Sequence, residues 1–144
     1  MSPATYRILD AVADSFDPLL AIIALICPLR RKPRAILFYY LSAAAAIGFV
    51  YFVRAIDGRE QIWRSFGLDF STHSAFAASL AVSMGAFRRN WIAPLALITV
   101  LYFSLELIMR YHGLLDILSS AMVAALAALV LHLAIKPSSA DDAD

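Results

Sequence analysis

Residues 91–135 read WIAPLALITVLYFSLELIM, RYHG and LLDILSSAMVAALAALVLHLAI, and they give the clearest indication of the fold class. Its two apolar runs, Trp91 to Met109 and Leu114 to Ile135, are separated by a short polar connection that contains a charge. At 1.5 Å per residue, each run is long enough to cross a hydrocarbon core of about 30 Å. The stretch therefore predicts two consecutive transmembrane helices.

Apolar runs recur toward the N-terminus. Two more run from Ala35 to Val53 and from about Thr72 to Phe87. A weaker one has its core at Leu19 to Cys27 and must extend toward the N-terminus to cross a membrane. Of the 144 residues, 62% are hydrophobic, which exceeds the about 45–50% of soluble domains. We therefore expect an all-α integral membrane bundle of about five transmembrane helices. Residues 1–136 form one membrane-embedded domain, and residues 137–144 are expected to be a disordered polar tail.

The charges argue for an orientation and against some partners. The net charge is +1, and no basic stripe is left for nucleic acid. The single cysteine, Cys27, excludes an intramolecular disulfide. Basic residues gather in the first-to-second loop, in the third-to-fourth loop and after the last run: Arg30, Arg31, Lys32, Arg34, Arg88, Arg89 and Lys136. The positive-inside rule then places the N-terminus outside and the C-terminus inside, in a plasma membrane such as the bacterial inner membrane.

The weak first run carries three carboxylates on one helical face. Asp10, Asp14 and Asp17 are spaced at i, i+4 and i+7. Either this face looks into the bundle, or the first turns of the helix lie outside the lipid. Because a carboxylate in lipid is costly, we expect the second arrangement.

Two histidines stand at matching places in the predicted topology. His73 begins the third span and His112 begins the fifth, so both lie at the same membrane depth. Asp116 follows His112 by four residues, which on a helix places both on one face within hydrogen-bonding reach. A carboxylate there would hold one ring nitrogen and leave the other as a nucleophile or base. Each histidine could instead be a tolerated interfacial residue, and His112 and Asp116 could be a structural pair.

Residues that suit an anion lie on the same side. Ser71 and Thr72 are good N-cap residues for the third span, and a helix N-terminus offers unpaired N–H groups to phosphate. The sequence also places four arginines there, which could add bidentate contacts: Arg54, Arg59, Arg64 and Arg110. Taken singly, each arginine could equally anchor a lipid headgroup, and the serine and threonine could be caps alone.

These residues resemble motifs of the type-2 phosphatidic acid phosphatase superfamily of membrane lipid phosphatases. The family's Pro-Ser-Gly-His corresponds to residues 70–73, Phe-Ser-Thr-His, and the end of its Ser-Arg-x5-His-x3-Asp corresponds to His112-x3-Asp116. The resemblance covers roughly residues 50–125. The first family motif, Lys-x6-Arg-Pro, is absent, and the serine and arginine of the third motif are replaced by Leu105 and Glu106.

The resemblance implies a phosphatase or phosphotransferase that acts on a lipid phosphate or diphosphate at the outer, periplasmic face. His112 would attack phosphorus and form a phosphohistidine, Asp116 would orient it, and His73 would protonate the leaving group. No metal or organic cofactor is implied. Two alternatives stay open: an acyl or other group transferase that uses the same two histidines, and a non-catalytic membrane subunit that binds a headgroup or a partner. Association with a second copy or with a partner membrane protein is also left open.

Overall fold

The computed structural model describes residues 2–135, and within this range the chain is a bundle of antiparallel helices without strands. The long helices are α1 (Pro3–Ile26), α2 (Pro33–Glu60), α4 (Thr72–Phe87), α5 (Ile92–Met109) and α6 (Leu114–Ile135). Short pieces, α3 (Ile62–Ser65) and the 3-10 turn η1 (Arg89–Trp91), lie in two of the connections. The expected all-α fold is confirmed. The predicted tail, residues 137–144, lies outside the described residues.

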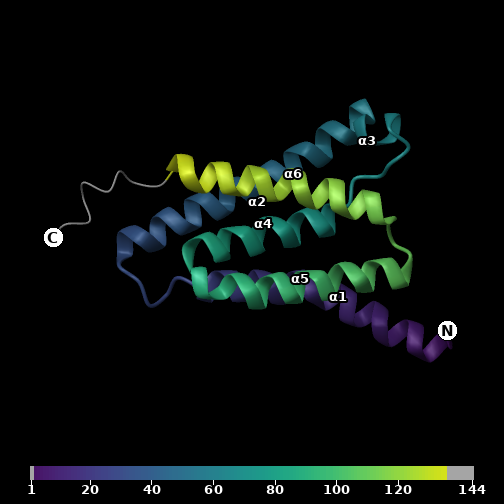
Figure 1. Ribbon diagram of the computed structural model, residues 1–144, viewed down its shortest axis with the longest axis horizontal. Coiled ribbons are helices and arrows are strands. Elements are labelled where there is room, and N and C mark those ends of the chain that lie inside the picture. Colours follow the sequence, from purple (N-terminus) through teal and green to yellow (C-terminus); the bar gives the residue numbers. More distant parts are fainter. Residues whose placement is uncertain (1, 136–144) are drawn as a thin grey trace.

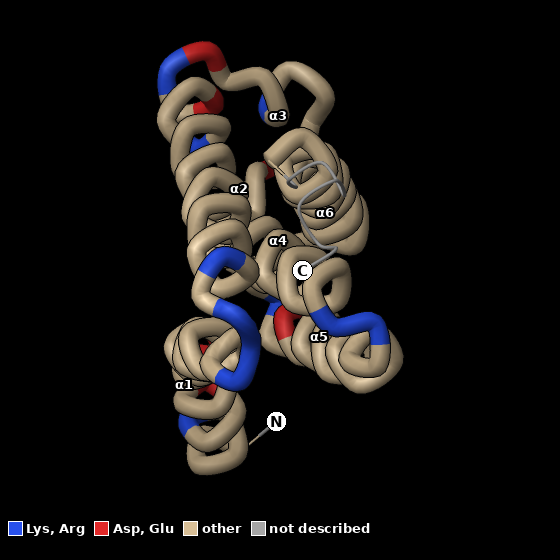
Figure 2. The backbone as a smooth tube through the Cα atoms, turned by 90° about the vertical axis from the view of Figure 1, so that its left-hand side faces the viewer, with Lys and Arg blue, Asp and Glu red and all other residues tan. Residues whose placement is uncertain are grey.

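The helices alternate in direction along the bundle (Figure 1). The N-terminus of α1, the end of α2, α3, the start of α4 and the α5–α6 connection gather at one end, here called the α3 end (Figure 1). The basic connections after α1 and after α4 lie at the opposite end, where Figure 2 shows them as blue bands facing the viewer. The two histidine-bearing helix starts therefore share an end that is distinct from the basic loops.

Three helical segments are long and apolar enough to cross a membrane: Pro33–Glu60, Arg89–Met109 and Leu114–Ile135. Helix α4 has 16 residues, a length of about 24 Å that is short of a hydrocarbon core. Helix α1 has the length but includes the three aspartates. The structure thus supports a membrane protein with three candidate spans among residues 2–135, and a total of five spans stays a prediction.

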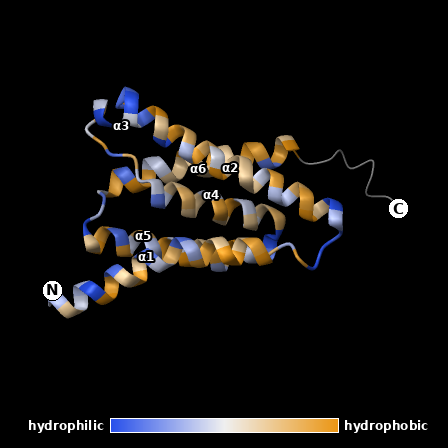
Figure 3. Cartoon of the chain, turned by 180° about the vertical axis from the view of Figure 1, so that it is seen from behind, coloured by the Kyte–Doolittle hydropathy of each residue, from blue (hydrophilic) through white to orange (hydrophobic). Residues whose placement is uncertain are grey.

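The surface agrees with a lipid environment. Large apolar side chains point outward along α6, among them Leu118, Met122 and Val130. Figure 3 shows hydrophobic colour along the middle of the helices and hydrophilic colour near their ends. A soluble protein rarely exposes such continuous apolar surface, so the outer face fits hydrocarbon.

Helix α4 lies at the centre and packs against α1, α2, α5 and α6. Its buried positions are mostly small residues, including Ala75, Ala77, Ala78 and Ser79. Small side chains let membrane helices approach closely. At Gly85 a Cβ would lie 3.2 Å from the Cγ1 of Ile92, so this glycine permits the tight turn into α5.

Candidate functional site

A pocket of about 320 Å³ at the α3 end, here called the histidine pocket, contains both predicted histidines. It is lined from α1, α4, α5 and the α5–α6 connection by Asp10, Ala13, Asp14, His73, Tyr102, Tyr111 and His112. The two histidines are 39 positions apart in the chain, and antiparallel packing around α4 brings them together. The two histidines therefore lie at the same end of the bundle, and their depth in a membrane stays a prediction.

His73 lies in the first turn of α4 and pairs with α1. Its Nδ1 is 2.7 Å from Oδ2 of Asp17. The imidazole is 63% exposed, whereas the Asp17 side chain is 21% exposed. A carboxylate on Nδ1 favours a proton there and leaves Nε2 available for chemistry. The aspartate face of α1 therefore looks into the bundle, while the expectation that its first turns lie outside the lipid stays a prediction.

His112 pairs with a carboxylate other than the expected one. Its Nδ1 is 3.4 Å from Oδ2 of Asp69, in the connection before α4. Asp116 instead accepts two backbone hydrogen bonds of 2.8 Å, from the N–H of Asp69 to Oδ1 and from the N–H of Gly113 to Oδ2. The expected Asp116–His112 contact is therefore replaced.

The reason for this replacement is the position of the helix start. Helix α6 begins at Leu114, so His112 precedes it and the i, i+4 geometry of a helix does not apply. Asp116 lies in the first turn, where a carboxylate satisfies the free amides of the helix N-terminus. A Cβ at Gly113 would lie 3.1 Å from Asp116 Oδ2, so a glycine suits this cap. Asp116 thus positions the backbone of Asp69, which in turn contacts His112.

Beneath the histidine pocket lies a buried polar network joining α4, α5 and α6. The Ser71 N–H donates to Ser120 Oγ over 2.9 Å, and Ser71 Oγ donates to Ser74 Oγ over 2.8 Å. Ser74 Oγ in turn donates to Oε2 of Glu106, which is only 1% exposed. Ser71 also caps α4 by accepting from the Ser74 N–H. The predicted substrate contact Ser71 is thus fully buried, while Thr72 is half-buried.

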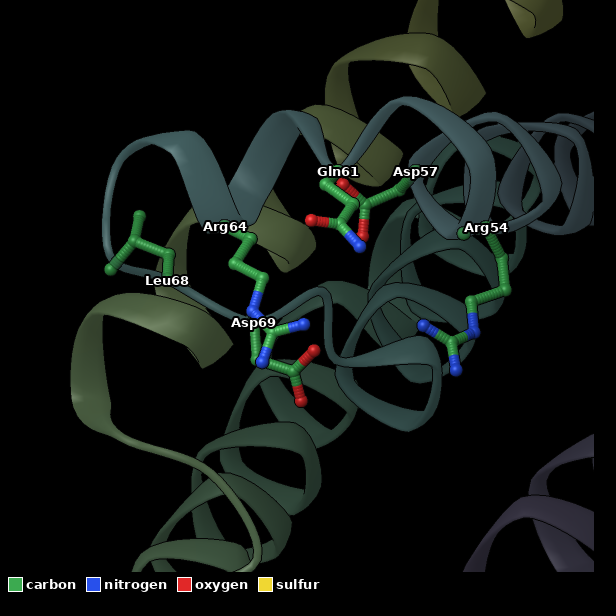
Figure 4. Close-up of a pocket in the computed structure, with 7 residues that line it drawn as sticks. Arg54, Asp57, Gln61, Arg64, Leu68 and Asp69 are labelled. Atoms are coloured by element: carbon green, nitrogen blue, oxygen red, sulfur yellow. The ribbon is translucent and has the colours of Figure 1, made fainter.

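The predicted arginines do not line the histidine pocket. Arg54 and Arg64 line a second pocket, of about 420 Å³, here called the arginine pocket. Figure 4 shows their guanidinium groups extending toward the same space. Its other lining residues are Asp57, Gly58, Gln61, Leu68 and Asp69. Arg59 and Arg110 are exposed and line neither pocket.

Asp69 connects the two pockets. It lines the arginine pocket and its carboxylate also contacts His112, which lines the histidine pocket. The connection that carries Asp69 is held on one side by Asp116. On its other side, the indole N–H of Trp63 donates to Ser119 Oγ over 2.9 Å, and the indole ring packs edge-on against Phe70. An anion in the arginine pocket would therefore lie beside the Asp69–His112 pair.

Two further lining residues, Tyr111 and Asp10, contact each other. The Tyr111 hydroxyl donates to Asp10 Oδ1, and this hydrogen bond raises the pKa of the Tyr111 phenol above its usual range. Sequence reasoning missed Asp10, Asp14 and Tyr111 as pocket residues. The i, i+4, i+7 spacing of the aspartates was the available signal, because it fixes them on one face.

Residues 2–135 contain no group of three or more His, Cys, Asp or Glu side chains arranged to hold a metal ion. What the pocket offers is acid–base chemistry. Two imidazoles face one cavity, and each has a carboxylate near Nδ1. Such a pair can supply one nucleophile or base and one proton donor.

No family model, curated protein or solved structure matches the chain. The likeness to lipid phosphatases consequently rests on the two short motifs, and the function is argued from the pocket.

Proposed function

We propose that this chain is a membrane lipid phosphatase or phosphotransferase whose reaction takes place in the histidine pocket. The observation that carries the proposal is the meeting of His73 and His112 in one cavity, each with a carboxylate near Nδ1. Two imidazoles held in this way are the groups that a two-step transfer through a covalent histidine requires. The motif resemblance supports phosphate as the transferred group.

In the proposed reaction, His112 Nε2 attacks the phosphorus of a lipid phosphate. The N–P bond forms while the P–O bond to the lipid breaks, and His73 Nε2 gives its proton to the leaving alkoxide. Water then attacks the phosphohistidine, His73 takes a proton from that water, and inorganic phosphate leaves. Asp17 stabilises the imidazolium of His73 across the 2.7 Å contact. Asp69 stabilises the positive charge that His112 develops.

The arginine pocket offers guanidinium groups to an anionic substrate, beside the carboxylates of Asp57 and Asp69 that also line it. Phosphoryl transfer depends mainly on electrostatic stabilisation, and Arg54 and Arg64 offer two guanidinium groups to one space. This pocket adjoins the reacting histidine through Asp69. A diphosphate or an extended headgroup could engage both pockets at once, with the distal phosphate on the arginines.

A second candidate is a group transfer without a phosphate cradle, such as acyl transfer. It is favoured by the lining of the histidine pocket, which within the described part of the chain includes Asp10 and Asp14 but neither lysine nor arginine. Glu106, in the place of the family's arginine, is buried next to Ser74. In this reading His112 is a base rather than a nucleophile toward phosphorus. A third candidate, a non-catalytic headgroup-binding subunit, would not need either imidazole.

We also propose that the α3 end faces the outside of a bacterial inner membrane. The support is the gathering of basic connections at the opposite end (Figure 2), because such loops stay in the cytoplasm. A cysteine placed at Glu60 should then react with an impermeant thiol reagent from the outside. Labelling from the cytoplasmic side alone would contradict this orientation.

The test of the activity is phosphate release by the purified chain from a panel of lipid phosphates and diphosphates. His112→Ala should abolish release, and His73→Ala should slow it by orders of magnitude for substrates with a poor leaving group. His132→Phe is the matched control, because His132 lies near the far end of α6 and packs edge-on against Phe38. It should leave the rate close to that of the wild type.

Three results would decide among the candidates. Release that disappears in His112→Ala but persists in His132→Phe supports the phosphatase. Transfer of an acyl group that depends on both histidines, without phosphate release, selects the second candidate. A cellular function that survives both histidine substitutions selects the binding subunit.

A further inference from the structure

An apolar pocket of about 340 Å³ lies between α1 and α5, here called the seam groove. Its walls include Phe16, Leu19 and Ile23 from α1, and Trp91, Leu95 and Ile98 from η1 and α5. Its volume falls within the range of about 300–1,000 Å³ typical of ligand pockets. Among residues 2–135, its lining carries no charged side chain, so it suits a hydrocarbon occupant.

The seam groove lies next to the histidine pocket, and both take lining residues from α1 and α5. The histidine pocket takes Asp10, Ala13 and Asp14 from α1, and the groove begins at Phe16 on the same helix. At the boundary the rings of Phe16 and Tyr102 stack, with centroids 3.8 Å apart and planes 5° apart. Since Phe16 lines the groove and Tyr102 lines the histidine pocket, this ring pair is their shared wall.

The dimensions fit a lipid chain that leaves a headgroup at the α3 end. On this side its lining residues run from Trp91 to Ile98, seven positions along the chain, so the groove extends for about 10 Å beside η1 and α5. Its edges are open to the surroundings of the bundle, because Leu19 is 56% exposed and Ile98 is 41% exposed. A chain can therefore enter sideways from the bilayer without passing through the core.

We propose that the seam groove binds the hydrocarbon chain of the lipid whose headgroup occupies the histidine pocket. The inference rests on the proposed function only for the phosphate headgroup. The groove sets the orientation of the bound lipid. Its headgroup lies between α1 and the start of α4, and its hydrocarbon chain lies between α1 and α5. Because lipid and groove are equally apolar, selection comes from packing against the groove walls rather than from hydrophobic transfer.

A second apolar pocket provides a matched comparison. It measures about 440 Å³, and its described lining residues come from α4, α5 and α6, including Val82, Val100 and Leu129, and not from α1. Ile98 and Val100 lie two positions apart on α5, both at the surface, and each lines a different pocket. A larger side chain at Ile98 should fill the seam groove, whereas a larger side chain at Val100 should not. Comparing the two variants distinguishes an effect on the groove from a general effect on α5.

The experiment uses the full chain in phosphatidylcholine nanodiscs with a trace of phosphatidic acid that carries a diazirine on one acyl chain. After illumination, labelled peptides are mapped by mass spectrometry, with and without excess unmodified phosphatidic acid. We expect competed labelling on residues 16–23 and 91–98. Ile98→Trp and Leu19→Trp should each lower it about tenfold, which corresponds to about 1.4 kcal/mol and is within the cost of overfilling a packed site. Val100→Trp should retain the wild-type level.

Other outcomes would overturn the inference. These are labelling of the two segments that excess lipid does not compete, insensitivity to both seam substitutions, or an equal loss in Val100→Trp. The proposed function is tested separately. Phosphate release without competed labelling would remove the groove and keep the phosphatase, whereas competed labelling without release would keep the groove and remove the phosphatase.

Discussion

Asp116→Ala provides a sharp test of how the site is held together. The wild-type carboxylate accepts two hydrogen bonds of 2.8 Å from the backbone N–H groups of Asp69 and Gly113. The substitution removes both and frees the connection before α4 from the start of α6. Asp69 would then lose its fixed place beside His112.

The expected loss of stability follows from these two bonds. A hydrogen bond to a charged group contributes about 1.5–3 kcal/mol when well buried and less when exposed. Asp116 is half-buried, so we expect a total of about 1–3 kcal/mol, which includes the usual cost of losing a helix cap. Glu60→Ala, which removes an exposed carboxylate at the end of α2, should change stability by less than about 0.5 kcal/mol.

The assay is unfolding by sodium dodecyl sulfate followed by circular dichroism, run as a double-mutant cycle with His112→Ala. Because Asp116 bonds to backbone rather than to His112, their coupling energy should stay below about 1 kcal/mol. A coupling of about 3 kcal/mol, or an Asp116→Ala variant as stable as the wild type, would show that Asp116 does not hold the site through the backbone of Asp69 and Gly113. Direct pairing of Asp116 with His112 would then be the better account.

Three further perturbations follow from the same geometry. Ser74→Ala leaves the buried Glu106 carboxylate without its serine partner, so it should cost about 1–3 kcal/mol, and Glu106→Gln in the same background should recover part of that loss in the detergent titration. Asp10→Asn should lower the pKa of the Tyr111 phenol toward about 10, as read by ultraviolet titration of the phenolate. Because the native pKa is raised, the stabilisation by this bond is complete below the unfolded pKa and is lost as pH rises through the folded pKa. Trp63→Phe removes the indole hydrogen bond to α6 and should cost about 0.5–1.5 kcal/mol in the same detergent titration.

The apolar pattern predicted the helices well where the runs are long and clean. The last span was expected over Leu114 to Ile135 and the structure has α6 over the same residues. Helix α2 runs to Glu60, well beyond Val53, because charged residues such as Arg54 and Arg59 are good helix formers once outside the apolar part. Hydropathy marks the apolar part of a helix and cannot mark its polar end.

The sequence predicted which histidines belong to the site, but it did not predict the residues that they contact. His73 and His112 follow from topology, since helix starts on one side of a bundle lie at one end. Their carboxylate partners do not, because Asp17 and Asp69 are distant in sequence and are brought close only by the packing of α1 and the connection before α4. Asp116 was assigned to His112 on the assumption of a continuous helix, which the start of α6 removes.

The end of the bundle at which an arginine lies does not determine the pocket that its side chain enters. All four predicted ones lie toward the α3 end of the chain's helices, yet only Arg54 and Arg64 share a pocket. The direction of each side chain depends on where its helix ends and turns. At Gln61 the chain takes a left-handed conformation with φ of 51°, which separates α2 from α3 and allows Arg64 to extend toward the same space as Arg54 (Figure 4).

The most direct test of the account is to trap the proposed intermediate. The purified chain is mixed briefly with a radiolabelled lipid phosphate, quenched in alkali and digested, and the labelled peptide is sequenced by mass spectrometry. We expect an acid-labile, alkali-stable label on His112 that is absent from His112→Ala and present in His132→Phe. Release of phosphate with a label on another residue, or unchanged turnover in His112→Ala, would contradict the central claim.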